Sequence, residues 1–203
     1  VIGGSNYTYW YEDFYWSVGS KSINVNPNYD SNNLGAYDRL FHKNNESFEQ
    51  WYTTAGQIVQ AGNLSVQKYG SNLSNYYWEI YHLLGDPSLS PYVGLPFTIS
   101  SNLPDSIAIG SSNLPIQTSP FAFVGVSQNG QLIGASQADS TGGVNVIFTN
   151  IINSMDKLKV VITNQFSYPI IDSINVLIPN YPFVNINSLK YYNNQQQEVE
   201  ELK

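Results

Sequence analysis

Residue types that can carry chemistry are scarce in this chain. It has no cysteine, and its two histidines, His42 and His82, lie far apart in the sequence. Without a thiol there is no disulfide and no thiolate nucleophile or metal ligand, and no carboxylate pair accompanies either histidine. A Gly-x-Ser-x-Gly segment, which would indicate a serine nucleophile, is also absent. The sequence therefore predicts no catalytic residue and no metal site in this chain.

The two histidines are better explained by structure. His42 follows a hydrophobic run and precedes Lys43-Asn44-Asn45, which is typical of an exposed loop histidine. His82 is expected in a helix among aromatic residues, one turn before Gly85, where a partial positive charge is favourable. Asp86, between Gly85 and a proline, is expected to bond backbone amides in a tight turn.

Two adjacent carboxylates, Glu12 and Asp13, begin a short helix predicted over residues 12–18. At that position they are expected to stabilise the helix N-terminus through its macrodipole. Two alternatives stay open, because adjacent carboxylates can also bind calcium or select a basic side chain of a substrate.

The composition limits the classes of protein. Hydrophobic residues make up 42% of the 203, aromatic residues 14% and charged residues only 11%, with a net charge of −7. This chain can fill a core, and its surface must be covered mainly by neutral polar groups, as is common in extracellular bacterial proteins. The lack of a basic cluster argues against nucleic-acid binding, and no run is long enough to span a membrane.

Helical periodicity is confined to the first half of the chain. Residues 47–60 carry an amphipathic stripe behind a capping box formed by Ser47 and Gln50, and the pattern ends at Gly62. A second helix is predicted over residues 74–84, with Gly85 after its C-terminus and Pro87 preventing its continuation. Strands are predicted at residues 1–4 and 89–93, and residues 19–38 read as a long irregular segment.

After Leu95-Pro96 the pattern changes to short strands separated by turns. Asn129-Gly130 is a strong hairpin signal, and residues 140–143 form another turn. About seven strands in this region predict an immunoglobulin-like β-sandwich, and a further strand is expected at residues 181–186. The seven predicted runs are residues 97–99, 106–109, 121–127, 131–138, 144–148, 157–163 and 174–178.

Four blocks in order resemble the gingipain family of secreted, caspase-like bacterial cysteine peptidases. They are residues 2–19, 35–41, 61–64 and 76–92, the last containing Leu84-Gly85-Asp86-Pro87. The resemblance implies an α/β fold followed by an all-β part: the C-terminal part of a caspase-like α/β/α sandwich, then an immunoglobulin-like sandwich. We expect residues 1–94 to be the peptidase part, 95–179 the β-sandwich, and 180–203 a linker or the start of a further domain.

The resemblance also implies where the chemistry lies. In this family the catalytic histidine and cysteine precede the first block, so both are expected upstream of this chain, which alone should be inactive. By similarity, Trp10 lines the pocket for the residue before the cleaved bond, with packing at the domain edge as the alternative. Ser5, Asn6 and Tyr9 share its loop and are expected to hydrogen-bond an extended substrate.

The resulting hypothesis is the C-terminal portion of a secreted or cell-surface gingipain-like endopeptidase that supplies a pocket wall and scaffold. Its expected partners are the missing N-terminal half of the peptidase domain and a protein or peptide substrate. Structural calcium stays an open alternative, and no other cofactor is expected. The competing hypothesis is a non-catalytic surface protein that keeps the scaffold for binding or adhesion.

The two hypotheses differ in the sequence that precedes residue 1. A cysteine within a few tens of residues, with a His-Gly pair further upstream, is expected for the peptidase. The strand at residues 1–4 should then be a core strand with one open flank for the missing half. Sequencing the region upstream in the gene checks this, and absence of both residues would favour the binding protein.

Overall fold

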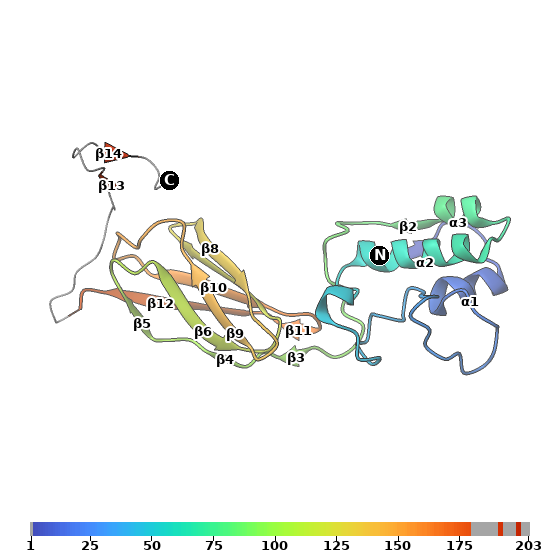
Figure 1. Ribbon diagram of the computed structural model, residues 1–203, viewed down its shortest axis with the longest axis horizontal. Coiled ribbons are helices and arrows are strands. Elements are labelled where there is room, and N and C mark those ends of the chain that lie inside the picture. Colours follow the sequence, from blue (N-terminus) through green and yellow to red (C-terminus); the bar gives the residue numbers. More distant parts are fainter. Residues whose placement is uncertain (1, 180–190, 193–197, 200–203) are drawn as a thin grey trace. The chain divides into compact units, whose positions relative to one another are not determined.

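The computed structural model describes residues 2–179 and two short strands, β13 (Tyr191–Tyr192) and β14 (Glu198–Val199) (Figure 1). Its contacts divide the chain into two compact units. The first comprises the chain up to Thr98 together with Asn164–Tyr168, and the second comprises Ile99–Thr163 and the chain from Pro169 onward. The domain boundaries expected after residues 94 and 179 stay predictions, and the strand expected at residues 181–186 lies outside the described residues.

The first unit combines helices with short strands. In Figure 1, α2 lies between α1 and α3, and it contacts both. Strands β1 and β2 pair antiparallel, while β3 and β11 pair parallel. The elements are β1 (Ile2–Gly4), α1 (Trp10–Val18), the 3-10 helix η1 (Phe48–Gln50), α2 (Ala55–Tyr69), α3 (Ser74–Ile80), β2 (Tyr81–Leu83), β3 (Phe97–Thr98) and β11 (Ser167–Tyr168).

The helix predicted at residues 47–60 is divided in two. The predicted capping box forms, with Gln50 Oε1 accepting from Ser47 N–H at 3.4 Å, but only the 3-10 turn η1 follows because Trp51 is extended. A second capping box starts α2: Thr54 Oγ1 accepts from Gln57 N–H at 3.3 Å, and Gln57 Oε1 accepts from Thr54 N–H at 3.0 Å. The helix therefore begins at Ala55 and ends at the left-handed Gly70.

The second predicted helix is also shorter than expected. It ends at Ile80, because residues 81–83 pair as β2 with β1, and Ile2 faces Leu83 across the ladder. His82 therefore lies on a strand with an exposed side chain, and the prediction of a helical His82 is wrong. Within this chain β1 is not buried, and β2 is its only strand partner among the described residues.

The strand predicted at residues 89–93 does not form. Asp86 makes the expected turn, accepting from the N–H and hydroxyl of Ser88 at 2.8 and 2.7 Å. The carbonyls of Pro87 and Leu89 then accept the N–H groups of Gly56 and Ala55, each at 2.9 Å. These carbonyls bond the first turn of α2, where backbone donors have no partner inside the helix.

The second unit contains two sheets that share one hydrophobic core (Figure 1). Their strand orders are β5-β12-β10-β7-β8 and β4-β6-β9. Each predicted run overlaps a strand, although the first, β3, belongs to the other unit. The strands are β4 (Ser101–Asn102), β5 (Ser106–Ala108), β6 (Asn113–Thr118), β7 (Phe123–Gln128), β8 (Gln131–Gln137), β9 (Gly143–Ile147), β10 (Leu158–Thr163) and β12 (Ile170–Leu177).

Local signals explain both the correct and the missed strands here. Asn129 and Gly130 have φ of 52° and 79°, as the predicted hairpin between β7 and β8 requires. Strand β6 was not predicted, since Pro115 interrupts its sequence pattern. Its neighbours Leu114 and Ile116 are nevertheless buried on one face, and Pro115 lies on the other.

The helical core depends on a close approach between α1 and α2. The indole of Trp16 lies over the backbone of Gly62, and a Cβ added to that glycine would stand 2.5 Å from the Trp16 Cδ2 and Nε1 atoms. The same indole donates its Nε1–H to Asn63 Oδ1 at 3.0 Å and stacks on Tyr81 with ring centroids 4.5 Å apart. Only glycine at position 62 leaves room for this packing.

We therefore predict that Gly62→Ala destabilises the first unit by about 2 kcal/mol or more, as overpacking of a core does. All four tryptophans lie in this unit, so urea unfolding followed by tryptophan fluorescence reports on it alone. Gly94→Ala is the matched control, since a Cβ there meets nothing within 4 Å. Equal unfolding midpoints for the two variants would contradict the packing account.

Candidate functional site

The candidate site is built on the first turns of α1. Tyr9 is the extended N-cap residue and Trp10 the first helical residue, so the helix begins two residues earlier than predicted. The Trp10 side chain is 84% exposed and that of Tyr9 47%. An exposed indole at the end of a fixed helix offers a flat apolar wall to a ligand.

Asp13 lies one turn after Trp10 and is held by tyrosines. Its Oδ1 accepts hydrogen bonds from the hydroxyls of Tyr77 at 2.9 Å and Tyr81 at 3.0 Å. No donor to its Oδ2 is present among residues 2–179. Glu12 turns away and accepts from the Ser71 hydroxyl at 2.8 Å. Both carboxylates lie in the first helical turn as expected, but tertiary hydrogen bonds give each a different environment.

Tyr77 ties the loop before α1 to the helical core. Its ring is fully buried, and its hydroxyl accepts the N–H of Tyr9 at 2.9 Å. Burial raises the pKa of both Tyr77 and Tyr81, and the neighbouring Asp13 carboxylate raises it further. Both hydroxyls therefore stay protonated and available as donors to Asp13.

A cavity of about 460 Å³ lies beside this turn. One face of α1 supplies Trp10, Asp13, Phe14, Ser17 and Val18, which lie three or four residues apart, as positions on one helical face do. The long loop at residues 19–38 supplies the remaining lining residues, Asn24, Val25 and Pro27. The cavity thus combines an indole, a carboxylate and apolar walls, which suits a long side chain with a positively charged end.

The long loop is fixed against α1. The N–H groups of Ala36 and Tyr37 donate to the carbonyls of Trp16 and Ser17 at 2.8 and 3.0 Å. Lys21 donates to the Asn28 carbonyl at 3.0 Å and lies 3.7 Å from the Asp38 carboxylate. Residues 19–38 contain no helix or strand, as predicted, yet these contacts hold the loop as a wall of the cavity.

The four residues expected to bind substrate are only partly brought together. Trp10 lines the cavity beside Asp13, and Tyr9 directly precedes it. Ser5 and Asn6 are exposed and do not line the cavity. Ser5 N–H donates to the Ile80 carbonyl at 2.8 Å, and Asn6 Oδ1 accepts the N–H of Tyr7 at 2.8 Å. The partnership of Trp10 with Asp13 was not predicted, although their spacing of three residues on one helix indicates a shared face.

The histidines lie apart from this site. His42 is half-buried, so its prediction as an exposed loop residue is wrong: it stacks on Trp51 at 3.7 Å, and its Nε2 lies 2.8 Å from Gln165 Oε1. Burial lowers the pKa of His42. Within the described part of the chain, no three or more His, Cys, Asp or Glu residues are grouped to hold a metal ion.

Comparison with solved structures defines the class of fold. A structure titled "Structure of Protease" aligns with 86% of this chain and 39% of its own, with a TM-score of 0.70 and 35% identity. The crystal structure of the Arg-specific cysteine proteinase gingipain R aligns with 64% of the chain at a TM-score of 0.57 and 15% identity. The chain therefore has the mixed α/β fold of part of a gingipain protease structure.

Sequence comparison identifies the family. Over 196 residues the chain is 36% identical to Lys-gingipain W83 and 35% identical to Lys-gingipain 381, both of Porphyromonas gingivalis. The chain belongs to the gingipain family. The matches cover 93% of this chain but 11% of each relative, so the chain spans about a tenth of their length. No family model matches it, and none of the described helices is long and apolar enough to cross a membrane.

Because of the two tyrosines that bond Asp13, we predict that the first unit becomes less stable at alkaline pH. Below pH 10 both Tyr77 and Tyr81 are protonated in the folded and unfolded chain, so their contribution to stability is complete. Because burial raises their pKa in the folded state, the unfolded chain ionises first as the pH rises above 10, and the free energy of unfolding falls. Urea midpoints followed by tryptophan fluorescence should stay nearly constant up to about pH 10 and then decrease up to pH 11.5.

Tyr81→Phe should flatten this decrease, because it removes one of the groups that titrate only on unfolding. Tyr7→Phe, which changes an exposed ring, is the control. A slope that is the same in Tyr81→Phe and in the unsubstituted chain would contradict the assignment.

Proposed function

We propose that this chain is the C-terminal portion of the catalytic domain of a gingipain-like cysteine endopeptidase. The observation that carries the proposal is the cavity formed by Trp10 and Asp13, within a chain that belongs to the gingipain family. The catalytic histidine and cysteine lie in a preceding segment. This portion contributes the wall that recognises the side chain before the cleaved bond.

Among long side chains with a positively charged end, we propose lysine as the one that this cavity binds. Its aliphatic stem packs along the Trp10 indole, and its ammonium group reaches the free Oδ2 of Asp13. A carboxylate whose other oxygen already accepts two hydrogen bonds is held in place, so little entropy is lost when the cation binds. The relatives of highest identity reported above carry the name Lys-gingipain, which agrees with this specificity.

The segment between β1 and α1 is proposed to contact the backbone of the same substrate. Ser5, Asn6 and Tyr9 are exposed on it, and Tyr76 fixes its middle by donating to the Tyr7 carbonyl at 2.8 Å. Fixed polar groups on an extended segment suit main-chain hydrogen bonding to a peptide.

The missing half of the peptidase domain is the proposed partner of β1. The strand is exposed on one edge, and Tyr7, on the segment that follows it, is 86% exposed. An added strand and the catalytic segment would cover this edge, whose free backbone groups otherwise face water. The protein is proposed to act outside the cell, because its low share of charged residues, 11%, is common in extracellular bacterial proteins.

The second unit is proposed to be an immunoglobulin-like domain. It has two sheets around one apolar core, a five-stranded one that is antiparallel except for the parallel pair β5–β12 and an antiparallel one of three strands, with no cysteine to staple them. That arrangement is compatible with the immunoglobulin class of β-sandwiches, in which packing alone can supply the stability.

The specificity proposal is tested in the complete gene product, with fluorogenic peptides that carry lysine, arginine or norleucine before the cleaved bond. Asp13→Asn should lower kcat/KM for the lysine peptide by about 30- to 150-fold, corresponding to about 2–3 kcal/mol for the lost charge pair. The norleucine peptide, which has no charge, should be affected much less. Glu12→Gln is the matched control, because it removes the adjacent carboxylate outside the cavity.

Equal losses for lysine and norleucine in Asp13→Asn would contradict the assigned role. The reaction class is checked separately with a thiol alkylator, which should abolish all hydrolysis. Activity that survives alkylation, or a complete gene product that hydrolyses no peptide, would favour the alternative of a non-catalytic surface binding protein.

A further inference from the structure

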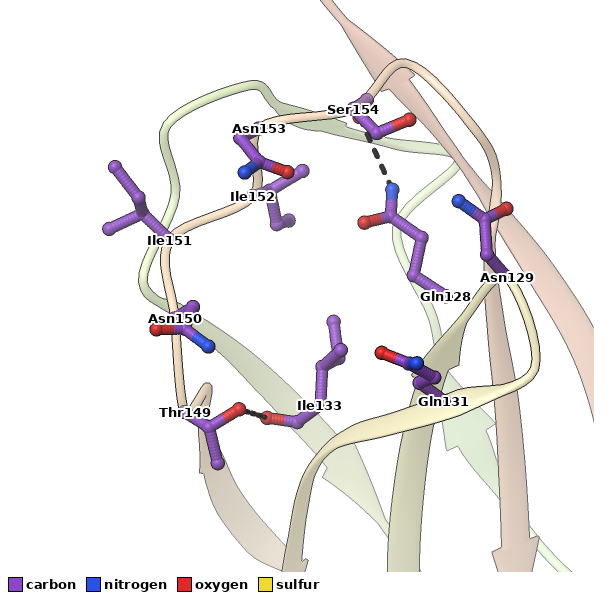
Figure 2. A pocket seen from close by; sticks show the side chains of 10 residues that line it. All are labelled: Gln128, Asn129, Gln131, Ile133, Thr149, Asn150, Ile151, Ile152, Asn153 and Ser154. Atoms are coloured by element: carbon purple, nitrogen blue, oxygen red, sulfur yellow. Dashed lines mark hydrogen bonds between the residues drawn. The ribbon is translucent and has the colours of Figure 1, made fainter.

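A second cavity, of about 620 Å³, lies in the second unit between the β7–β8 hairpin and residues 149–154 (Figure 2). No charged side chain and no aromatic ring lines it. Uncharged amide side chains surround the opening, while isoleucines form its apolar part. The cavity beside α1 is lined by a carboxylate and an indole, which this one lacks, so we expect the two cavities to bind different ligands.

A β-bulge shapes the apolar floor. The pairing of β7 with β8 changes register from Val126 opposite Gly134 to Ser127 opposite Leu132, which leaves Ile133 as the extra residue. Figure 2 shows its side chain pointing into the cavity. Bulges in edge strands commonly redirect a side chain in this way.

The loop that forms the facing wall is fixed at both ends and in the middle. Thr149 donates its N–H and hydroxyl to the Ile133 carbonyl at 2.8 and 3.2 Å. Gln128 Nε2 donates to the carbonyls of Ser154 and Asp156 at 3.2 and 2.7 Å. Ile152, only 3% exposed, donates its N–H to a carbonyl of the segment before β6 at 2.9 Å. The cavity is therefore formed before any ligand arrives, which lowers the entropic cost of binding.

Three amide side chains at the opening are free to bond a ligand. Gln131, Asn150 and Asn153 are exposed, and their side chains have no hydrogen-bond partner among residues 2–179. Figure 2 shows them around the same opening. Each amide offers both a donor and an acceptor, the combination that binds hydroxyl groups and other amides.

We propose that this cavity binds a neutral saccharide residue that carries an acetamido group, an N-acetylhexosamine. Its methyl group packs on the half-buried Ile133, and its amide and hydroxyl groups bond Gln131, Asn150 and Asn153. This inference rests on the second unit alone and is independent of the peptidase proposal.

Other ligand classes fit the cavity less well. A charged ligand would meet no opposite charge, because all lining side chains are neutral. An extended peptide that adds a strand to the edge of β8 would need free backbone groups there, but Thr149 already occupies the Ile133 carbonyl. A sugar without an acetamido group would leave the isoleucine floor uncovered.

Isothermal titration calorimetry on the 203-residue chain tests the proposal, with N-acetylglucosamine trisaccharide as the probe and maltotriose as a sugar of the same length without acetamido groups. The trisaccharide should bind with a Kd of about a millimolar or below, and maltotriose should bind at least about tenfold more weakly. Asn150→Ala and Gln131→Ala should each weaken binding about three- to tenfold, the usual effect of one lost hydrogen bond.

Asn102→Ala is the matched control, since it removes an exposed amide of the same unit that does not line the cavity. Both tested side chains are exposed and unbonded, so the variants should keep the circular dichroism spectrum of the original chain. The proposal is overturned if the trisaccharide does not bind, or if Asn150→Ala and Gln131→Ala both bind it as tightly as the original chain does. Preferential binding of a neutral acetylated tripeptide amide over the trisaccharide would likewise overturn it.

Discussion

The burial of the Trp16 indole against the backbone of α2 is the contact on which the candidate site depends. Because position 62 is glycine, the ring can lie on the helix itself, and Asn63 satisfies its N–H. The Trp16 indole also stacks on the ring of Tyr81, which belongs to β2. Together these contacts set where α1 lies relative to α2 and β2, and α1 carries the cavity wall.

The aromatic residues around Trp16 also fix the position of the Asp13 carboxylate, the charged group of the site. Tyr81, which packs on Trp16, also donates its hydroxyl to Asp13, and Tyr77 does so from α3. Burying a carboxylate among aromatic rings without such donors would cost free energy. The packing of the rings and the hydrogen bonds to Asp13 must therefore form together. One face of α1 therefore packs in the core, while Trp10, at its first turn, remains exposed.

Much of this arrangement could be predicted from local sequence, and the rest could not, for physical reasons. The hairpin at Asn129-Gly130 and the irregular loop at residues 19–38 follow from turn chemistry and from the absence of periodicity. The helix predicted at residues 47–60 is wrong because two capping boxes follow each other closely, and only tertiary contacts select the second. Strand β2 exists because β1 pairs with it, and Asp13 gains its role from tyrosines more than sixty residues away. Such long-range contacts leave no local signal in the sequence.

We propose that Trp10 and Asp13 form one wall of a lysine-selective pocket in a larger peptidase. A crystal structure of the complete protein, with a lysyl peptide inhibitor bonded to the catalytic thiol, tests it most directly. We expect the lysine ammonium within hydrogen-bonding distance of the Asp13 carboxylate and its aliphatic stem against the Trp10 indole. A lysine side chain bound elsewhere, with the cavity beside α1 empty, would contradict it.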